Sequence, residues 1–146
     1  MPSDTPRSTA RIAGHPIHPM LVPFPIVCFV GTLITDITYA ITADMQWANF
    51  SAWLLLAGLV VSVFAVIAGL VDAIGDRRIL RLRPAWIHVL GNLVALALAI
   101  LNALVHTRDA YTSVVPAGLI LSALTVVVLI VTGWVGGQMV YREARR

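Results

Sequence analysis

The stretch WIHVLGNLVALALAILNALVH, residues 86–106, decides the fold of this chain. It is apolar and long enough to cross the roughly 30 Å hydrocarbon core of a bilayer as one helix. At about 100° per residue, its polar and small residues lie on one side, which should face other helices because hydrocarbon penalises unpaired amides and imidazoles. That side carries His88, Asn92, Ala95, Ala99, Asn102 and His106, opposite Leu90, Leu93, Leu101 and Leu104.

Three further segments meet the same criterion, residues 20–41, 51–74 and 115–138. The connectors are short, so neighbouring helices run antiparallel. The chain is 59% hydrophobic with a mean hydropathy of +0.89, more apolar surface than a water-soluble domain buries. We predict an all-α integral membrane protein: an up-down four-helix bundle over residues 14–146, preceded by a mobile polar arm, residues 1–13.

The basic residues predict the orientation of the bundle. All ten are arginines, and only Arg108 lies at the end opposite both termini. Arginine in short loops is retained in the cytoplasm, so we expect both termini to be cytoplasmic. The pI of about 9.8 then reflects topology, and the expected partner is the lipid bilayer rather than nucleic acid.

Three of the four histidines, His15, His18 and His88, lie at this cytoplasmic end. In HPIHP, residues 15–19, the prolines favour an extended, non-helical lead into the first helix. Imidazole is a common ligand of iron, zinc and copper, and a b-type haem takes two axial ligands. His88 with His15 or His18 is therefore a candidate haem or metal site. A second interpretation stays open, in which the repeat only caps the helix and bonds to loop carbonyls or lipid headgroups.

Asp72 and Asn92 lie at the same depth as these histidines and could orient the ligands. We expect Asp72 to pair with Arg77, Arg78 or His88. In the last span, Gly133 and Gly137 form a small-xxx-small pair that predicts close helix packing.

Asp36, an acid inside the first span, is a second candidate functional residue. Such an acid marks an ion path, a proton relay or a buried partner, and the partner here would be Thr32, Tyr39 or His106. A purely structural role is equally open. His106 lies about 27 Å from His88 along the helix, so the two cannot share a metal. We expect His106 to be solvated at the outer interface.

Enzyme motifs do not narrow the function. The chain contains no Walker loop, dinucleotide glycine fingerprint, HExxH, CxxC or GxSxG, so whether it is an enzyme stays open. Its single cysteine, Cys28, excludes an intramolecular disulfide.

Several sequence features occur together: GHPIHPMLVPFPI at residues 14–26, Asp36, GLVD at 69–72, an arginine-rich loop before His88, and GWVGGQMVY at 133–141. Over nearly its whole length the chain resembles a bacterial membrane family, domain of unknown function 2231. The resemblance implies a multi-pass protein of the bacterial inner membrane, in a redox setting because some relatives are joined to Rieske iron–sulfur or cytochrome modules. It places His15, His18, Asp36, Asp72, His88 and Asn92 among the candidate site residues.

The chain departs from the family pattern at Pro23 and Glu143, where relatives carry histidine. These departures count against a complete haem or metal site.

Two functional hypotheses follow. In the first, the protein takes part in membrane redox chemistry and electron transfer through a b-type haem or metal held by His15 or His18 together with His88. In the second, it is a cofactor-free accessory subunit, packed against a larger respiratory or photosynthetic complex or against copies of itself. A third, narrower hypothesis is an ion or proton path through Asp36.

Overall fold

The computed structural model describes residues 8–108 and 113–144, with side chains through Gln138. Four of its helical segments are long and apolar enough to cross a membrane, which confirms the all-helical fold with four spans. The elements are the strands β1 (Arg11–Ile12) and β2 (His15–Pro16), the helices α1 (Ile17–Leu21), α2 (Pro23–Thr42), α3 (Met45–Gly75), α4 (Arg83–His106) and α6 (Leu119–Ala144), and the turns η1 (Ile79–Arg81) and η2 (Val114–Gly118).

Some sequence predictions fall on residues that the structure does not describe. They are residues 1–7 of the N-terminal arm with Arg7, and the side chains of Tyr141, Arg142, Glu143, Arg145 and Arg146.

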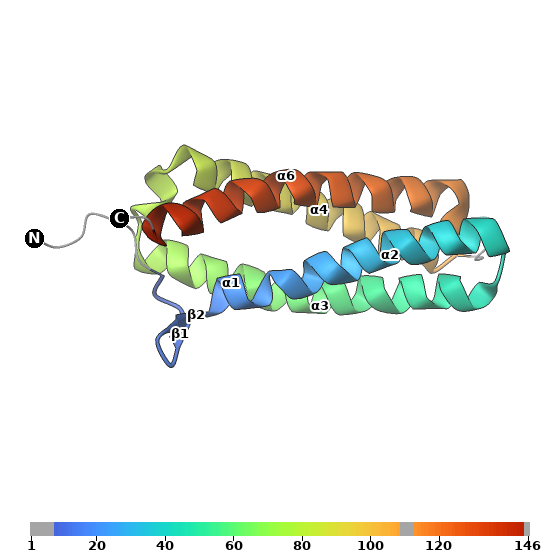
Figure 1. Cartoon of the computed structure of the whole chain (residues 1–146), viewed down its shortest axis with the longest axis horizontal. Coiled ribbons are helices and arrows are strands. Elements are labelled where there is room, and N and C mark those ends of the chain that lie inside the picture. The colour runs from blue at the N-terminus through green and yellow to red at the C-terminus, as the bar shows by residue number, and fades with distance from the viewer. Residues whose placement is uncertain (1–7, 109–112, 145–146) are drawn as a thin grey trace, which may run out of the picture.

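The long helices form two hairpins that pack side by side (Figure 1). Within the hairpins α2 packs on α3 and α4 packs on α6, while contacts of α2 with α6 and of α3 with α4 join the two hairpins. The end of α3, the start of α4 and the end of α6 lie at the same end of the bundle as β1 and β2 (Figure 1).

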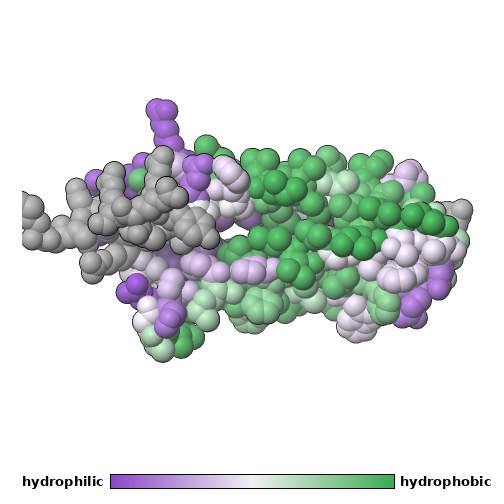
Figure 2. Space-filling view, viewed as in Figure 1, coloured by the Kyte–Doolittle hydropathy of each residue, from purple (hydrophilic) through white to green (hydrophobic). Residues whose placement is uncertain are grey.

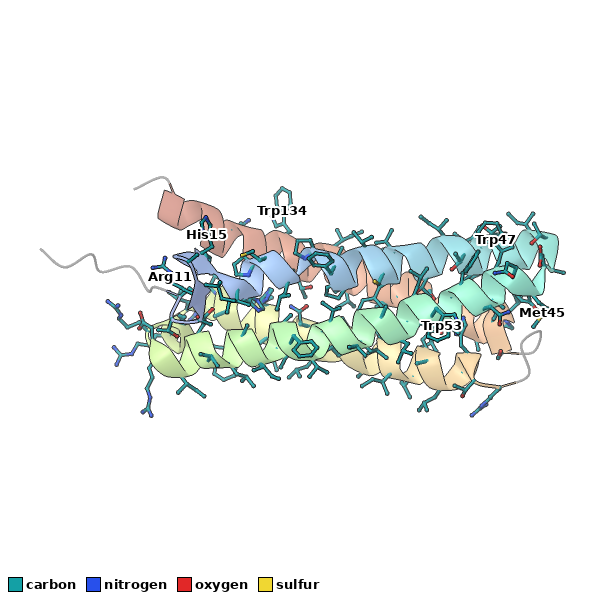
Figure 3. The ribbon with its side chains drawn as sticks, turned by 90° about the horizontal axis from the view of Figure 1, so that it is seen from below. Arg11, His15, Met45, Trp47, Trp53 and Trp134 are labelled. Carbon is teal, nitrogen blue, oxygen red and sulfur yellow. The ribbon has the colours of Figure 1, made fainter. Side chains whose placement is uncertain are left out.

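The bundle is apolar outside and partly polar inside. Figure 2 shows hydrophobic residues along its middle and hydrophilic residues gathered toward its two ends. Large side chains such as Trp53 and Trp134 are about 70% exposed, and Figure 3 shows Trp134 pointing away from the bundle. Hydroxyl and amide side chains, including Ser51, Thr32 and Asn102, are buried instead. This distribution suits helices in lipid, where polar groups bond across helix interfaces.

Helix α4 has the orientation predicted from its sequence. Ala95, Ala99 and Asn102 are at most 2% exposed, while the four leucines of the opposite side are each more than half exposed. Small and polar residues also form the buried sides of the first two spans, namely Thr32, Thr35, Asp36, Tyr39, Gly58, Ala65, Ala68 and Asp72.

Two helix starts differ from the prediction. Helix α3 begins at Met45 rather than near residue 51, because the Asp44 side chain caps it by accepting from the Gln46 N–H at 2.9 Å. His18 lies inside α1 rather than in extended chain. A proline in the first helical turn lacks only an N–H that has no partner there, so Pro19 does not prevent the helix.

The segment before α1 is tied to the end of α3 by Asp72. One carboxylate oxygen, Oδ1, accepts hydrogen bonds from the Ser8 hydroxyl at 2.8 Å and from the backbone N–H groups of Thr9 and Ala10 at 2.7 Å each. Residues 11–12 and 15–16 then pair as a small antiparallel ladder.

The expected pairing of Asp72 with Arg77, Arg78 or His88 is therefore wrong. The returning N-terminal segment brings backbone donors to Asp72, and Arg78 pairs with Asp76 instead, at 2.8 Å.

Because the interior is tightly packed, the free energy of unfolding should fall when a buried side chain is made larger. Ala99 is 0% exposed in the core, so Ala99→Leu should overpack it and lower the free energy of unfolding by about 1–3 kcal/mol. Denaturation in mixed micelles, followed by circular dichroism, measures the change. Ala97→Leu on the exposed side of the same helix is the control and should be nearly neutral. Equal losses in the two variants would contradict the packing described.

Candidate functional site

His18 and His88 lie together at the end of the bundle that carries β1 and β2. Their ring centroids are 6.0 Å apart and the ring planes are nearly perpendicular, at 85°. His18 comes from α1 and His88 from α4, so each hairpin contributes one imidazole. We call these two residues the imidazole pair.

A backbone carbonyl of the partner helix fixes each ring. The Nδ1 atom of His18 lies 2.7 Å from the Ala65 carbonyl oxygen, and that of His88 lies 3.1 Å from the Thr132 carbonyl oxygen. Because a carbonyl only accepts, Nδ1 carries the proton in both rings. The remaining Nε2 lone pair of each ring is the one with which such a histidine binds a metal.

Asn92 stands next to His88, as the sequence predicted from their shared side of the helix. Its Nδ2 donates to the His88 backbone carbonyl at 2.7 Å and lies 3.4 Å from the His88 Nε2. Among the residues that the structure describes, no hydrogen bond is made by Nε2 of His18.

Two glycines give the imidazoles their room. A Cβ added at Gly69 would lie 3.2 Å from the His18 Nδ1, and one at Gly136 would lie 2.8 Å from both Nδ1 and Cε1 of His88. Gly133 does not have the close-packing role predicted for it, because a Cβ there would meet nothing within 4 Å. The sequence does not distinguish Gly136 from its neighbours, because three glycines lie close together at positions 133, 136 and 137.

The other two predicted members of the site lie elsewhere. His15 is exposed in β2, where Nδ1 donates to the Ala13 carbonyl at 3.1 Å, the loop-carbonyl bond considered for the His-Pro repeat. Figure 3 shows His15 close to Arg11, before the start of α1. Asp72 holds the N-terminal segment. The structure thus brings His18, His88 and Asn92 together and leaves His15 and Asp72 apart from them.

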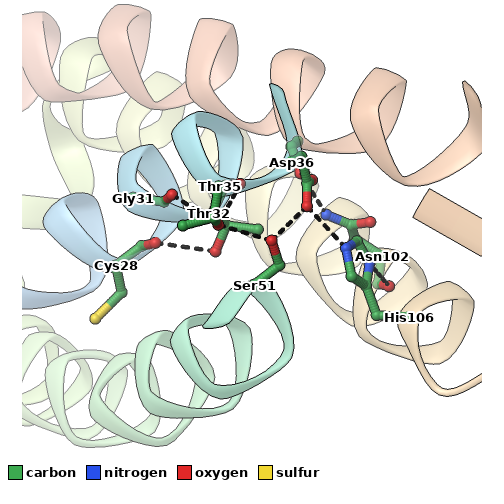
Figure 4. A network of polar contacts seen from close by, with 9 residues as sticks. Cys28, Gly31, Thr32, Thr35, Asp36, Ser51, Asn102 and His106 are labelled. Atoms are coloured by element: carbon green, nitrogen blue, oxygen red, sulfur yellow. Dashed lines mark hydrogen bonds and ion pairs between the residues drawn. The ribbon is translucent and has the colours of Figure 1, made fainter. Parts of the chain in front are cut away.

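A second polar cluster surrounds Asp36 (Figure 4). Asp36 is 0% exposed, and its Oδ1 lies 2.9 Å from Nε2 of His106, whose side chain is 2% exposed. The Ser51 hydroxyl donates to Oδ1 and the Ser122 hydroxyl to Oδ2, each at 2.5 Å. Four helices, α2, α3, α4 and α6, therefore each contribute one group to this cluster, which we call the Asp36 cluster.

The hydrogen bonds of this cluster are consistent with an ion pair. His106 Nδ1 donates to the Asn102 carbonyl at 3.0 Å, so an Nε2 that donates to Asp36 makes the ring an imidazolium. An ionised Asp36 then accepts three hydrogen bonds, and the pair is neutral overall. The cluster pairs an acid with a base, and both nitrogens of His106 are engaged in hydrogen bonds.

The sequence predicted this cluster in part. His106 lies against Asp36 as predicted, whereas the expectation of a solvated His106 is wrong because Asp36 of α2 and Gly118 of η2 cover it. The donors Ser51 and Ser122 were missed, since serine in an apolar span also bonds to its own helix.

Other polar side chains near the Asp36 cluster form hydrogen bonds of their own. Tyr39 donates its hydroxyl to the Met45 sulfur at 3.7 Å, and Thr32 donates to the Cys28 carbonyl at 3.0 Å. The Asn102 amide donates to the Ser122 hydroxyl at 2.7 Å, while its buried Oδ1 has no hydrogen-bond partner.

Within residues 8–108 and 113–144, no group of three or more histidine, cysteine or acidic side chains is placed to hold a metal ion. Any metal at the imidazole pair would have two protein nitrogen ligands and complete its coordination with other groups.

Four apolar spans, with their polar groups turned inward, define a multi-pass membrane protein. A family model described as a predicted membrane protein, domain of unknown function 2231, matches residues 14–145, so the chain belongs to that family. No curated protein and no solved structure matches the chain.

The buried ion pair predicts a strong dependence on both partners. Asp36→Ala removes the partner of three buried hydrogen bonds, those to His106, Ser51 and Ser122, and should lower the free energy of unfolding by about 3–5 kcal/mol. The double variant Asp36→Ala/His106→Ala should lose far less than the sum of the two single losses, since each single variant already removes the bond that the two side chains share. Denaturation in mixed micelles measures all three variants. Additive losses would show that the two side chains do not interact.

Proposed function

We propose that this protein is an up-down four-helix bundle of the bacterial inner membrane, with both termini in the cytoplasm, which binds one transition-metal ion between His18 and His88. The ion is either bare or the iron of a b-type haem, since both take imidazole ligands. The observation that carries the proposal is that a backbone carbonyl holds Nδ1 of both rings, which leaves Nε2 as the metal-binding nitrogen of each; at His88 the Asn92 amide also lies 3.4 Å from Nε2.

The orientation rests on the distribution of arginine. Arg11, Arg77, Arg78, Arg81 and Arg83 belong to the short connections at the end with the imidazole pair, and Arg108 to the opposite end. Positive residues in short loops are retained in the cytoplasm, so the imidazole pair lies toward the cytoplasmic face.

The spacing of the two rings suits a shared ion. An imidazole nitrogen binds a metal at about 2 Å, so two rings that approach one ion from opposite sides have centroids about 6 Å apart. The observed 6.0 Å agrees with this arrangement, whereas two ligands at a tetrahedral angle would bring the centroids to about 5 Å.

The surrounding groups would fix the ligands rather than bind the ion. The carbonyls of Ala65 and Thr132 set the tautomer and the ring orientation, and Asn92 restricts His88. Such outer bonds raise the basicity of a metal-binding imidazole. A metal at this position would place the protein in membrane electron transfer, the setting that its sequence resemblance implies. The cofactor-free accessory subunit stays a prediction that no specific contact favours.

Spectroscopy and metal analysis of the purified full chain test the proposal. We expect either a Soret band or one equivalent of a transition metal per chain, the first indicating haem and the second a bare ion. His18→Ala and His88→Ala should each reduce occupancy at least about 10-fold. His15→Ala is the matched control and should leave occupancy unchanged, because His15 bonds to Ala13.

A chain that carries neither haem nor metal, and takes up neither when supplied, would contradict the proposal. Equal losses in His15→Ala and His18→Ala would place the site elsewhere.

A further inference from the structure

The two hairpins repeat the same contacts at matching positions. In each, an imidazole donates from Nδ1 to a backbone carbonyl of the partner helix and lies against a glycine one turn beyond that carbonyl. The residues are His18, Ala65 and Gly69 in the first hairpin, and His88, Thr132 and Gly136 in the second.

The buried positions repeat in the same register. When the halves are aligned on these histidines and carbonyls, buried residues of one hairpin coincide with buried residues of the other along both helices. The side chains differ at each of these positions, so the repeat is visible in the burial pattern and not in residue identity. The coinciding pairs are Pro25/Ala95, Phe29/Ala99, Thr32/Asn102, Ser51/Gly118, Leu55/Ser122, Gly58/Thr125, Ser62/Leu129 and Ala65/Thr132.

Two contacts place an axis between the halves. Corresponding residues of two symmetry-related copies can touch only near the axis that relates them. His18 and His88 correspond and lie 6.0 Å apart, and Asp36 and His106, also 70 residues apart in sequence, are bonded at 2.9 Å. The packing of α2 on α6 and of α4 on α3 follows the same symmetry. The axis runs lengthwise through the bundle, because the two contacts are about 27 Å apart along the helices.

We infer that the chain consists of two copies of one helical hairpin, Ile17–Gly75 and Arg83–Ala144, and that the histidine and glycine kept by both copies form one metal site on their common axis. The ligand class, a single transition-metal ion met equally by both halves, rests on the function proposed above. The inference adds Gly69 and Gly136 as positioning residues for that site.

Residue identity between the copies supports this assignment. With residues 17–36 matched to 87–106 and residues 47–75 matched to 114–142, the identical residues other than isoleucine, leucine and valine are the histidine and the glycine. An ion on the axis needs the same ligand and the same space from each half, which explains why the histidine and the glycine are identical in both. At the other axial position the copies differ, as Asp36 and His106, because an acid and a base neutralise each other without an added ligand.

A gain of binding tests the symmetry in the full chain. Asp36→His places an imidazole opposite His106 on the axis, so the variant should bind one equivalent of Cu²⁺ more than the wild-type chain. Asp36→Asn removes the same charge without adding a ligand and should bind no additional Cu²⁺. Equilibrium dialysis gives the stoichiometry, and electron paramagnetic resonance reports nitrogen ligation of the added ion.

The outcomes separate this inference from the proposed function. If Asp36→His binds one Cu²⁺ while the wild-type chain binds neither haem nor Cu²⁺, the result supports the repeat and rejects the proposed function. A wild-type site without any added equivalent in a helical, monodisperse Asp36→His protein overturns the repeat alone. Absence of both contradicts both.

The glycines provide a second test that does not depend on a new site. Gly69→Ala and Gly136→Ala should each weaken binding of haem or Cu²⁺ at least about 10-fold, with the larger loss for Gly136→Ala because its Cβ lies nearer the ring. Gly133→Ala is the control, since its Cβ meets open space. A loss in only one of the two variants would mean that the halves do not hold the ion alike, and would overturn the inference.

Discussion

Hydrocarbon offers no hydrogen-bond partners, so every polar atom within the four spans has to find its partner inside the bundle. This constraint explains why the helices bury alanine, serine and threonine and turn leucine outward. Small residues let the helices approach, and the approach brings side chains of one helix within reach of the backbone of another. His18 on the Ala65 carbonyl and Asp36 between two serines are both consequences of that close approach.

The same constraint has produced two different polar centres. At the Asp36 cluster, acid and base satisfy each other and two hydroxyls complete the carboxylate. At the imidazole pair, backbone carbonyls hold both rings through Nδ1, and the rings meet edge to face with their centroids 6.0 Å apart. The bonds of the Asp36 cluster contribute to stability without any group from outside the chain. The difference in hydrogen bonding, rather than the kind of residue, is the reason that we propose binding at the histidines near the arginine-rich end.

Much of the fold follows from the sequence because periodicity within one helix is a local property. The inward side of α4, from Asn92 through Asn102, could be predicted from helical geometry alone. Contacts between helices could not, since they depend on the relative axial position of two segments. The choice of His18 over His15 required the actual start of α1, and the partners of Asp72 required the path of residues 8–10. Gly136 differs from Gly133 only by which side of α6 meets α4, which no local pattern specifies.

The spacing of the two centres bears on how membrane voltage acts on the protein. Their separation of about 27 Å is close to the hydrocarbon thickness, so the centres lie near opposite faces of the bilayer. A unit charge that crosses the full thickness experiences about 2.3 kcal/mol per 100 mV. A charge that reaches either centre from the adjacent face crosses only a small part of that drop. Membrane voltage therefore has little effect on a charge that enters either centre from its own side. It would drive or oppose only the transfer of a charge from one centre to the other.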